Sequence, residues 1–219
     1  MRAHSHISVA KSKVRDGEIT RHSGLKLEGG RVFLVASGLG LPRSWPFALE
    51  AVARGFERGL EEAHEKAGGA RRVRVDRLVA AADRVRRELA EACDRLVERT
   101  LPDCAFAAIA MDEGDLHVVS AGPCRVYLHR SGKPQRLTPR DEAKDGALVA
   151  RITQCTTPLE PGDLVMAGSV SAFSMRSIAQ VVTVLQDDPR TEPPILASLL
   201  TEPAAQAGVG AAAVVLRIA

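Results

Sequence analysis

The segment VASGLG, residues 35–40, has the composition of a turn that positions a ligand or a reactive group. An apolar run ends there at small residues, two glycines follow, and a long helical pattern begins soon afterwards. An acid at position 37 would suit a cation, but the residue is Ser37. Ser37 is also a candidate nucleophile, although its context is S-G-L-G instead of the G-x-S-x-G of a nucleophile elbow. Because the sequence assigns it no partner His or Asp, the more ordinary interpretation is a small residue that fills the turn.

The densest positive run, RRVRVDR at residues 71–77, could bind an anion. Arginine holds phosphate with a bidentate fork, so an acidic or phosphorylated partner would suit Arg71, Arg72 and Arg74. The more ordinary interpretation is the solvated start of a helix, in which Glu88 and Glu91 pair with the arginines that follow.

Trp45 and Phe47 follow the turn closely. An exposed Trp and Phe could form a binding hot spot, since aromatic residues are enriched in such sites. Packing of a helix onto a sheet is the more ordinary explanation of the same two residues.

Composition and charge exclude several classes of function. The chain has 219 residues, 45% of them hydrophobic and 26% charged, as in a typical globular protein. A net charge of +3 and 3% aromatic residues argue against nucleic acid as a partner. No apolar stretch approaches the roughly 20 residues that span a bilayer, and the N-terminus lacks a secretory pattern. The four cysteines form no C-x-x-C pair, so we expect reduced thiols in a cytoplasmic protein without a membrane partner.

Hydrophobic periodicity predicts blocks of short strands and longer helices. Turn residues separate the short apolar runs, which is typical of antiparallel strands. The expected order is strands at 5–14 and 31–36, helices from 46 and from 75, a meander of strands at 104–111, 116–122, 124–130 and 133–138, an irregular stretch at 140–160, a strand after 161, helices at 171–187 and 194–207, and a last strand at 211–219. This order favours an α+β fold, a central antiparallel β-sandwich flanked by helices in α-β-β-α layers, with residues 1–219 as one domain.

Several segments, taken in order, resemble the PPM (type 2C) family of metal-dependent protein phosphatases. RVFLVASGLG is similar to the strand and D-G-x-G turn of that family, and HVVSAGPCRVYLHRSGKPQRLT is similar to its G-D-S-R-x-Y-L hairpin and Q-L-T segment. PGDLVMAGSVSAF resembles the P-G-D segment that leads to S-D-G, and GVGAAAVVLRIA resembles the strand after R-D-N. The resemblance covers about residues 5–219. It implies a β-sandwich flanked by helices and two Mn or Mg ions held by aspartates, with a bridging water that attacks phosphoserine or phosphothreonine.

The chain departs from this pattern at the positions of the metal-binding acids. Gly38 is kept, and its carbonyl could be a ligand. Because hard divalent cations need several oxygen ligands, mostly carboxylates, we expect no metal cofactor and no catalysis. If the match is right, the departing positions lie close together in space. They are Ser37 for the Asp of D-G-x-G, Pro123 for the Asp of G-D-S-R, Val170 and Ser171 for the Asp and Gly of S-D-G, and Val209 and Gly210 for the Asp and Asn of R-D-N.

The resemblance and its departures together predict a pseudophosphatase. Such a protein would be catalytically inactive and would act as a protein-binding or regulatory module in bacterial Ser/Thr phospho-signalling, with a kinase or a phosphoprotein as its partner. One alternative is a divergent metal-dependent phosphatase with a rebuilt site, for which the candidate ligands are Asp16, Glu18, Asp141 and Asp163. The other alternative is a structural subunit of a larger assembly.

Overall fold

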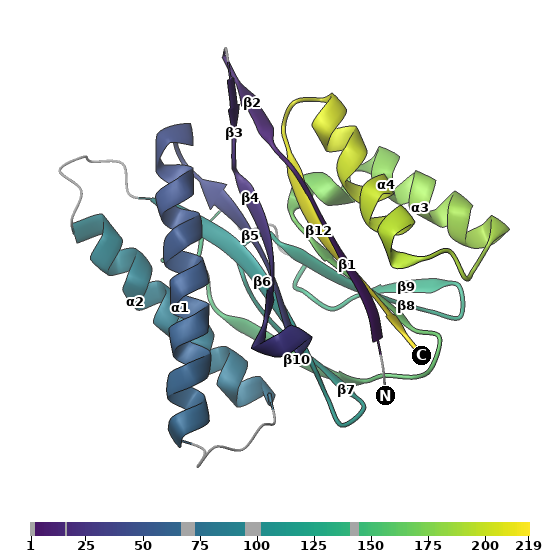
Figure 1. The fold of residues 1–219 in the computed structure, drawn as a ribbon, viewed down its shortest axis with the longest axis horizontal. Helices are drawn as coiled ribbons and strands as arrows, with labels where there is room; N and C mark the ends of the chain where they lie inside the picture. The colour runs from purple at the N-terminus through teal and green to yellow at the C-terminus, as the bar shows by residue number, and fades with distance from the viewer. Residues whose placement is uncertain (1–2, 16, 67–72, 95–101, 141–144) are drawn as a thin grey trace.

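Two antiparallel sheets pack face to face, and each carries a pair of helices on its outer surface (Figure 1). The structure is a computed structural model that describes residues 3–15, 17–66, 73–94, 102–140 and 145–219. Helices α1 and α2 cover one sheet, and α3 and α4 cover the other. The predicted α+β sandwich in α-β-β-α layers is therefore confirmed, while the assignment of residues 1–219 to one domain stays a prediction.

The first sheet has the strand order β1-β12-β11-β8-β9, and the second has β10-β7-β6-β5-β4. The strands of the first sheet are β1 (Ala3–Ala10), β12 (Ala211–Ile218), β11 (Leu164–Gly168), β8 (Arg125–Arg130) and β9 (Lys133–Arg136). Those of the second are β10 (Thr153–Pro158), β7 (Asp115–Ala121), β6 (Asp103–Asp112), β5 (Val32–Leu39) and β4 (His22–Leu27). A separate hairpin pairs β2 (Ser12–Val14) with β3 (Gly17–Ile19). The helices are α1 (Trp45–Lys66), α2 (Val75–Asp94), α3 (Met175–Asp187) and α4 (Pro193–Gln206), with short 3-10 turns at η1 (Glu28–Gly30), η2 (Pro42–Ser44) and η3 (Val170–Phe173).

Strand β5 shows how the sandwich buries both faces of a sheet. Phe33 and Val35 belong to the core between the sheets, whereas Leu34 and Ala36 pack toward α1 and α2. All four are at most 2% exposed, because successive side chains of a strand point to opposite faces. Ser37 continues the row of Phe33 and Val35, so its side chain lies at the end of the core between the sheets.

Helices α1 and α2 approach each other closely at two glycines of α1. A Cβ added at Gly55 would lie 2.6 Å from Cα of Val85, and one at Gly59 would lie 2.5 Å from Cα of Ala81. The missing side chains therefore permit the contact. Figure 1 shows the pair lying across the outer face of the second sheet.

Two details of the predicted strand order are wrong. Residues 153–158 lie in the stretch expected to be irregular, but they form β10, an edge strand on β7. Its side chains alternate between half-buried and exposed, so it lacks the apolar run by which strands are recognised. The strands expected as one meander also divide, because β6 and β7 pair in the second sheet whereas β8 and β9 pair in the first.

None of the helices in the described ranges is long and apolar enough to cross a membrane.

Candidate functional site

A chain of hydrogen bonds joins the two sheets at the end of the sandwich where β5 finishes. His22 on β4 lies directly opposite Ser37 on β5, and its Nδ1 is 2.9 Å from the Ser37 Oγ. Its Nε2 lies 3.4 Å from the carbonyl oxygen of Val209, just before β12. The segments that carry Ser37 and Val209 are therefore bridged by one imidazole.

The imidazole of His22 is neutral at neutral pH. Burial, and then the positive charge of Arg21, lower the pKa of His22 to about 4, against a raising effect of the hydrogen bond to Val209. Because a carbonyl oxygen can only accept a hydrogen bond, Nε2 carries the proton and donates a hydrogen bond to the carbonyl of Val209. Nδ1 therefore accepts a hydrogen bond from the Ser37 hydroxyl. His22 is 4% exposed and Ser37 is 7% exposed, so the pair is a buried and satisfied polar contact.

The thiol of Cys124 contacts Ser37 from the core between the two sheets. Its Sγ lies 3.7 Å from the Ser37 Oγ, and it immediately follows Pro123. Burial raises the pKa of Cys124 to about 12, partly offset by the hydrogen bond with Ser37, so the thiol stays protonated. The departing position Pro123 is thus adjacent to a residue that touches Ser37.

The guanidinium of Arg21 is hydrogen-bonded to the carbonyl oxygen of Gly38, the glycine that this chain shares with the D-G-x-G turn. Its Nε donates to the carbonyl oxygen of Gly38 at 3.3 Å, and its Cζ lies 4.9 Å from the centre of the Trp45 ring. The Trp45 Nε1 donates to the carbonyl of Gly40 at 3.2 Å, which fixes the indole. A Cβ at Gly38 would lie 2.8 Å from the Trp45 side chain, so this close approach requires glycine. Trp45 is 7% exposed and packs, whereas Phe47 is 55% exposed.

The remaining departing positions lie beside the start of β12. The backbone nitrogen of Ser169 donates to the carbonyl of Ala212, and the Ala212 nitrogen donates to the Ser169 Oγ at 3.2 Å. The Oγ atoms of Ser169 and Ser171 lie 3.0 Å apart, so Val170 and Ser171 follow a strand end that is anchored on β12. Val170 is 41% exposed, which places it at the surface.

Gly210 lies between Val209 and β12 at a φ of +67°. A Cβ there would lie 2.5 Å from the Oγ of Ser12, and that Oγ donates to the carbonyl of Val209 at 2.6 Å. Glycine is therefore required by the local backbone. Val209 itself is 45% exposed.

Asp163 of the P-G-D segment has a structural role. It is 2% exposed, and Arg130 donates to both of its carboxylate oxygens, from Nε at 2.8 Å and from Nη2 at 2.6 Å. Burial is the largest single effect and raises the pKa of Asp163, but the hydrogen bonds from Arg130 and from the Glu160 backbone, together with the charge of Arg130, outweigh it and lower the pKa. Of the other candidate ligands for a rebuilt site, Glu18 is exposed on β3, and Asp16 and Asp141 lie outside the described residues.

The arginine run divides between internal contacts and surface. Arg71 and Arg72 lie outside the described residues, and Arg74 is exposed. Arg77 is 5% exposed and donates to Glu28 and to the carbonyl of Leu60. The proposed role of Arg71, Arg72 and Arg74 in partner binding stays a prediction.

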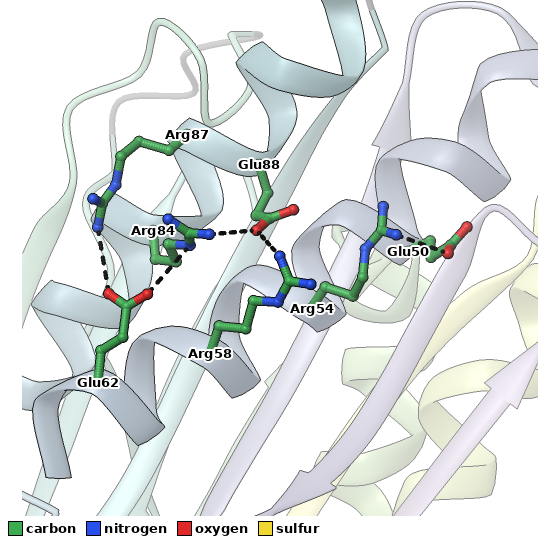
Figure 2. Close-up of polar contacts among 7 residues, drawn as sticks. All are labelled: Glu50, Arg54, Arg58, Glu62, Arg84, Arg87 and Glu88. Atoms are coloured by element: carbon green, nitrogen blue, oxygen red, sulfur yellow. Dashed lines mark hydrogen bonds and ion pairs between the residues drawn. The ribbon is translucent and has the colours of Figure 1, made fainter. Parts of the chain in front are cut away.

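Further along α2, arginines pair with glutamates of both long helices. Figure 2 shows Arg58 of α1 and Arg84 of α2 meeting at the carboxylate of Glu88, and Arg84 also reaches Glu62. Glu88 is 5% exposed; burial raises its pKa, but Arg58 and Arg84 outweigh this and lower it. These contacts hold α1 against α2.

His22 and Arg21 are the site residues that sequence reasoning missed. The two adjacent glycines Gly29 and Gly30 contained the signal, because a hairpin centred there pairs Leu27 with Val32 and hence His22 with Ser37. Counting outward from that turn finds the partner that the sequence alone did not assign to Ser37.

Comparisons with known proteins find the fold and little else. No protein-family model and no curated protein matches the sequence. Among solved structures, PppA, a key regulatory component of T6SS in Pseudomonas aeruginosa, has a TM-score of 0.74 at 15% identity, over 99% of this chain and 98% of that chain. The Mycobacterium tuberculosis serine/threonine phosphatase PstP/Ppp has a TM-score of 0.75 at 19% identity, over 99% and 98%. A PstP catalytic domain in complex with two manganese ions has a TM-score of 0.76 at 19% identity, over 98% and 97%. Such identities establish a shared fold.

These comparisons contradict the prediction that the chain is not an enzyme. Structures that share its fold over nearly the whole length include serine/threonine phosphatases. The departures at Ser37, Val170 and Val209 show which side chains stand at one end of the sandwich, but they are not a measurement of catalytic activity. The prediction of a non-enzyme is therefore wrong on present findings.

The prediction of no metal cofactor is contradicted in the same way, since one structure of this fold holds two manganese ions. The described donors around Ser37 nevertheless do not fit such a pair. Hard cations prefer carboxylate oxygens, whereas this end presents a hydroxyl, a neutral imidazole and a thiol, and the Gly38 carbonyl already accepts from Arg21. Within the described ranges, no three His, Cys, Asp or Glu side chains gather where they could hold a metal ion.

Proposed function

From the premise that this chain has the fold of the PPM-type serine/threonine phosphatases, we propose that it acts in bacterial Ser/Thr phospho-signalling by binding a phosphorylated partner protein. The partner is a Ser/Thr kinase in its phosphorylated form or a substrate of such a kinase. The observation that carries the proposal is the position of Arg21. Its guanidinium lies on the Gly38 carbonyl, at the end of the sandwich that the resemblance associates with phosphate chemistry.

The chemistry of the surrounding residues supports an anionic partner. Ser37, His22 and Cys124 are all uncharged at neutral pH, so they do not repel a phosphate group. The exposed side chains of Leu41 and Val209, at 43% and 45%, offer apolar surface to the residues that flank a phosphorylated side chain. A protein segment suits this mixture better than a small polar metabolite does.

The second candidate function is a divergent metal-dependent phosphoserine or phosphothreonine phosphatase. It is favoured by the likeness to a phosphatase structure with two manganese ions. Two acidic residues, Asp103 and Asp145, also lie near the end of β5. Asp103 is on β6 and pairs with Leu39 of β5. Burial has the largest effect in raising the pKa of Asp103, and the charge of Asp145 raises it further. The Oδ1 of Asp103 is bound by the backbone nitrogens of Cys104 and Leu148.

One experiment separates the two candidates. Purified protein is incubated with a set of phosphothreonine and phosphoserine peptides, with EDTA or with millimolar Mn, and both binding and phosphate release are measured. Binding that occurs with EDTA as well as with Mn supports the proposal. Release that requires Mn and scales with protein supports the divergent phosphatase. Neither binding nor release in either condition would overturn both and leave the structural subunit.

A further inference from the structure

We propose that the cavity between the α3–α4 turn and the start of β1 is a binding site for a small phosphate monoester of the sugar-phosphate class. The cavity has a volume of about 370 Å³, and its lining includes His4, Arg190, Glu192, Pro193, Pro194 and Arg217. The inference goes beyond the proposed function, because this cavity lies at the opposite end of β12 from Val209. The strand between these two ends measures about 20 Å.

The guanidinium of Arg217 on β12 is only partly used by the fold. Its Nη2 donates to the carbonyl of Thr191 at 2.8 Å, whereas its buried Nε has no hydrogen-bond partner in the part of the chain that the structure describes. Burial lowers the pKa of Arg217, against a raising effect of the charge of Asp188, so this cation is partly desolvated. A buried N–H without an acceptor costs free energy, and an oxyanion seated on this guanidinium supplies the missing acceptor.

The fold brings two further donors to the same place. His4 lies directly opposite Arg217 in the β1–β12 pairing, so their side chains share the outer face of the first sheet. The contact with Thr191 places the Arg217 guanidinium one residue from Arg190 in the α3–α4 turn. Asp188 fixes that turn, because its carboxylate accepts from the Arg190 backbone nitrogen at 2.9 Å. Figure 1 shows α4 lying across β1 and β12 beside this turn.

Neither arginine of the cavity is neutralised by an ion pair. Among the residues described, no Asp or Glu is ion-paired with Arg190 or Arg217, whereas Arg130 on the same sheet is paired with Asp163 and Glu160. Two guanidiniums and an imidazole can contact three oxygens of one phosphate group, but a carboxylate offers only two oxygens. The donor set therefore favours a phosphate over a carboxylate.

The other walls fit the organic group that carries the phosphate. Pro193 and Pro194 begin α4 and present ring surface without a backbone N–H, so the recognition depends on side chains. Glu192 is exposed and its side chain does not cap α4, so its carboxylate is available to accept a hydrogen bond from a hydroxyl group. The cavity volume lies in the range of small-molecule sites and is more than a lone phosphate ion fills. A ligand with the phosphate toward the arginines and its hydroxyls toward Glu192 matches both ends.

The experiment follows the Nε–H groups of the arginines by NMR. The isotope-labelled full chain is titrated with ribose 5-phosphate at physiological ionic strength, and ribose and inorganic phosphate are titrated in parallel. We expect saturable shifts of the Arg190 and Arg217 signals with ribose 5-phosphate. Ribose should bind at least tenfold more weakly, and inorganic phosphate should also bind more weakly than ribose 5-phosphate.

Variants assign the contacts. Arg217→Gln and Arg190→Gln should each weaken the binding of ribose 5-phosphate at least fivefold. Arg176→Gln is the matched control and should leave binding unchanged, because Arg176 is an exposed arginine of α3 outside this cavity and without an ion pair to any residue that the structure describes. Glu192→Ala should reduce the preference for ribose 5-phosphate over inorganic phosphate. Circular dichroism verifies folding, and should Arg217→Gln not fold, the exposed Arg190→Gln decides.

The failures of this inference and of the proposed function are distinguishable. Ribose 5-phosphate binding that is unchanged in the variants of Arg190 and Arg217 would overturn the inference, as would absence of binding by the unaltered chain. Shifts confined to the end that contains Arg21 and His22 would also overturn it, and they would leave the proposed function standing. Ribose that binds as tightly as its phosphate would show that no phosphate is recognised. Equal binding of inorganic phosphate would overturn the sugar-phosphate assignment.

Discussion

The imidazole of His22 and the hydroxyl of Ser37 are hydrogen-bonded at 2.9 Å across the β4–β5 pair, at the end of the sandwich. Through its second nitrogen the same imidazole reaches the carbonyl oxygen of Val209, just before strand β12 of the other sheet. An uncharged polar chain thus joins the neighbouring strands β4 and β5 to a segment that lies 187 residues beyond His22 in the sequence.

The stability of the fold should depend on the protonation of His22. An unfolded histidine titrates near 6.5, whereas the folded His22 has a pKa of about 4, so between these values only the unfolded state takes up the proton. The contribution is complete above about pH 7 and is lost as the pH falls, by up to about 3 kcal/mol at pH 4. Urea midpoints at pH 7, 6, 5 and 4 measure it.

The control for this prediction is the difference between variants, because protonation of buried carboxylates such as Asp163 also destabilises the folded protein in acid. His22→Gln should flatten the slope between pH 7 and pH 4, whereas His4→Gln should keep the slope of the unaltered chain. Equal slopes in all three proteins would contradict the assignment to His22.

Removal of the Ser37 hydroxyl should destabilise the fold. Ser37→Ala leaves the buried Nδ1 of His22 without its donor, and an unsatisfied buried polar group costs about 1–3 kcal/mol. Urea unfolding at pH 7 measures the change. Ser198→Ala on α4 is the matched control and should stay within about 0.5 kcal/mol. A loss for Ser37→Ala no larger than that of the control would show that the contact contributes nothing.

Asp163 and Arg130 should behave as one coupled unit. Arg130→Gln leaves the buried carboxylate of Asp163 without its cation, and this carboxylate also accepts from the backbone nitrogen of Glu160. The urea midpoint should therefore fall further for Arg130→Gln than for Arg54→Gln. The double variant with Asp163→Asn should lose less stability than the sum of the two single variants. Strict additivity would refute the coupling.

Two of the ion-paired glutamates in Figure 2, Glu88 and Glu50, should differ in their effect on stability. Glu88 is buried and accepts from two arginines, so Glu88→Ala should cost about 1–3 kcal/mol. Glu50 is exposed, and its ion pair among the described residues is with Arg54 four residues away, so Glu50→Ala should cost at most about 0.5 kcal/mol. Thermal melting of the two variants side by side gives the comparison, and equal losses would disprove it.

The sequence predicts well the features that depend on local pattern. Helix α1 and strand β12 follow from periodicity and lie where the pattern puts them, whereas β5 continues to Leu39, through residues expected to form the turn. The strand β10 escapes this reasoning because its stability comes from pairing with β7, and its own residues carry no apolar run. Sheet pairing is a long-range property that local periodicity does not encode.

The residues of the candidate site show the same difference between local motifs and long-range pairing. Ser37 and Gly38 are recognised from their motif, but His22 and Arg21 belong to no motif and gain their roles from the register of β4 on β5. The aspartate of P-G-D shows the opposite case. Its motif is recognised in the sequence, yet only the contact with Arg130 reveals that the carboxylate is used for structure.

The pairing of β1 with β12 also bears on how the chain folds. Ala3 lies opposite Ile218 and Ala10 lies opposite Ala211. The first described strand, β1, therefore cannot pair within its sheet until the last one, β12, is present. Strand β12 also separates β1 from β11, so during synthesis on the ribosome the first sheet lacks an inner strand until β12 has emerged. Contacts of such sequence separation slow folding. The half-sheet β11-β8-β9 meanwhile presents an unpaired edge at β11, with which another extended segment can pair.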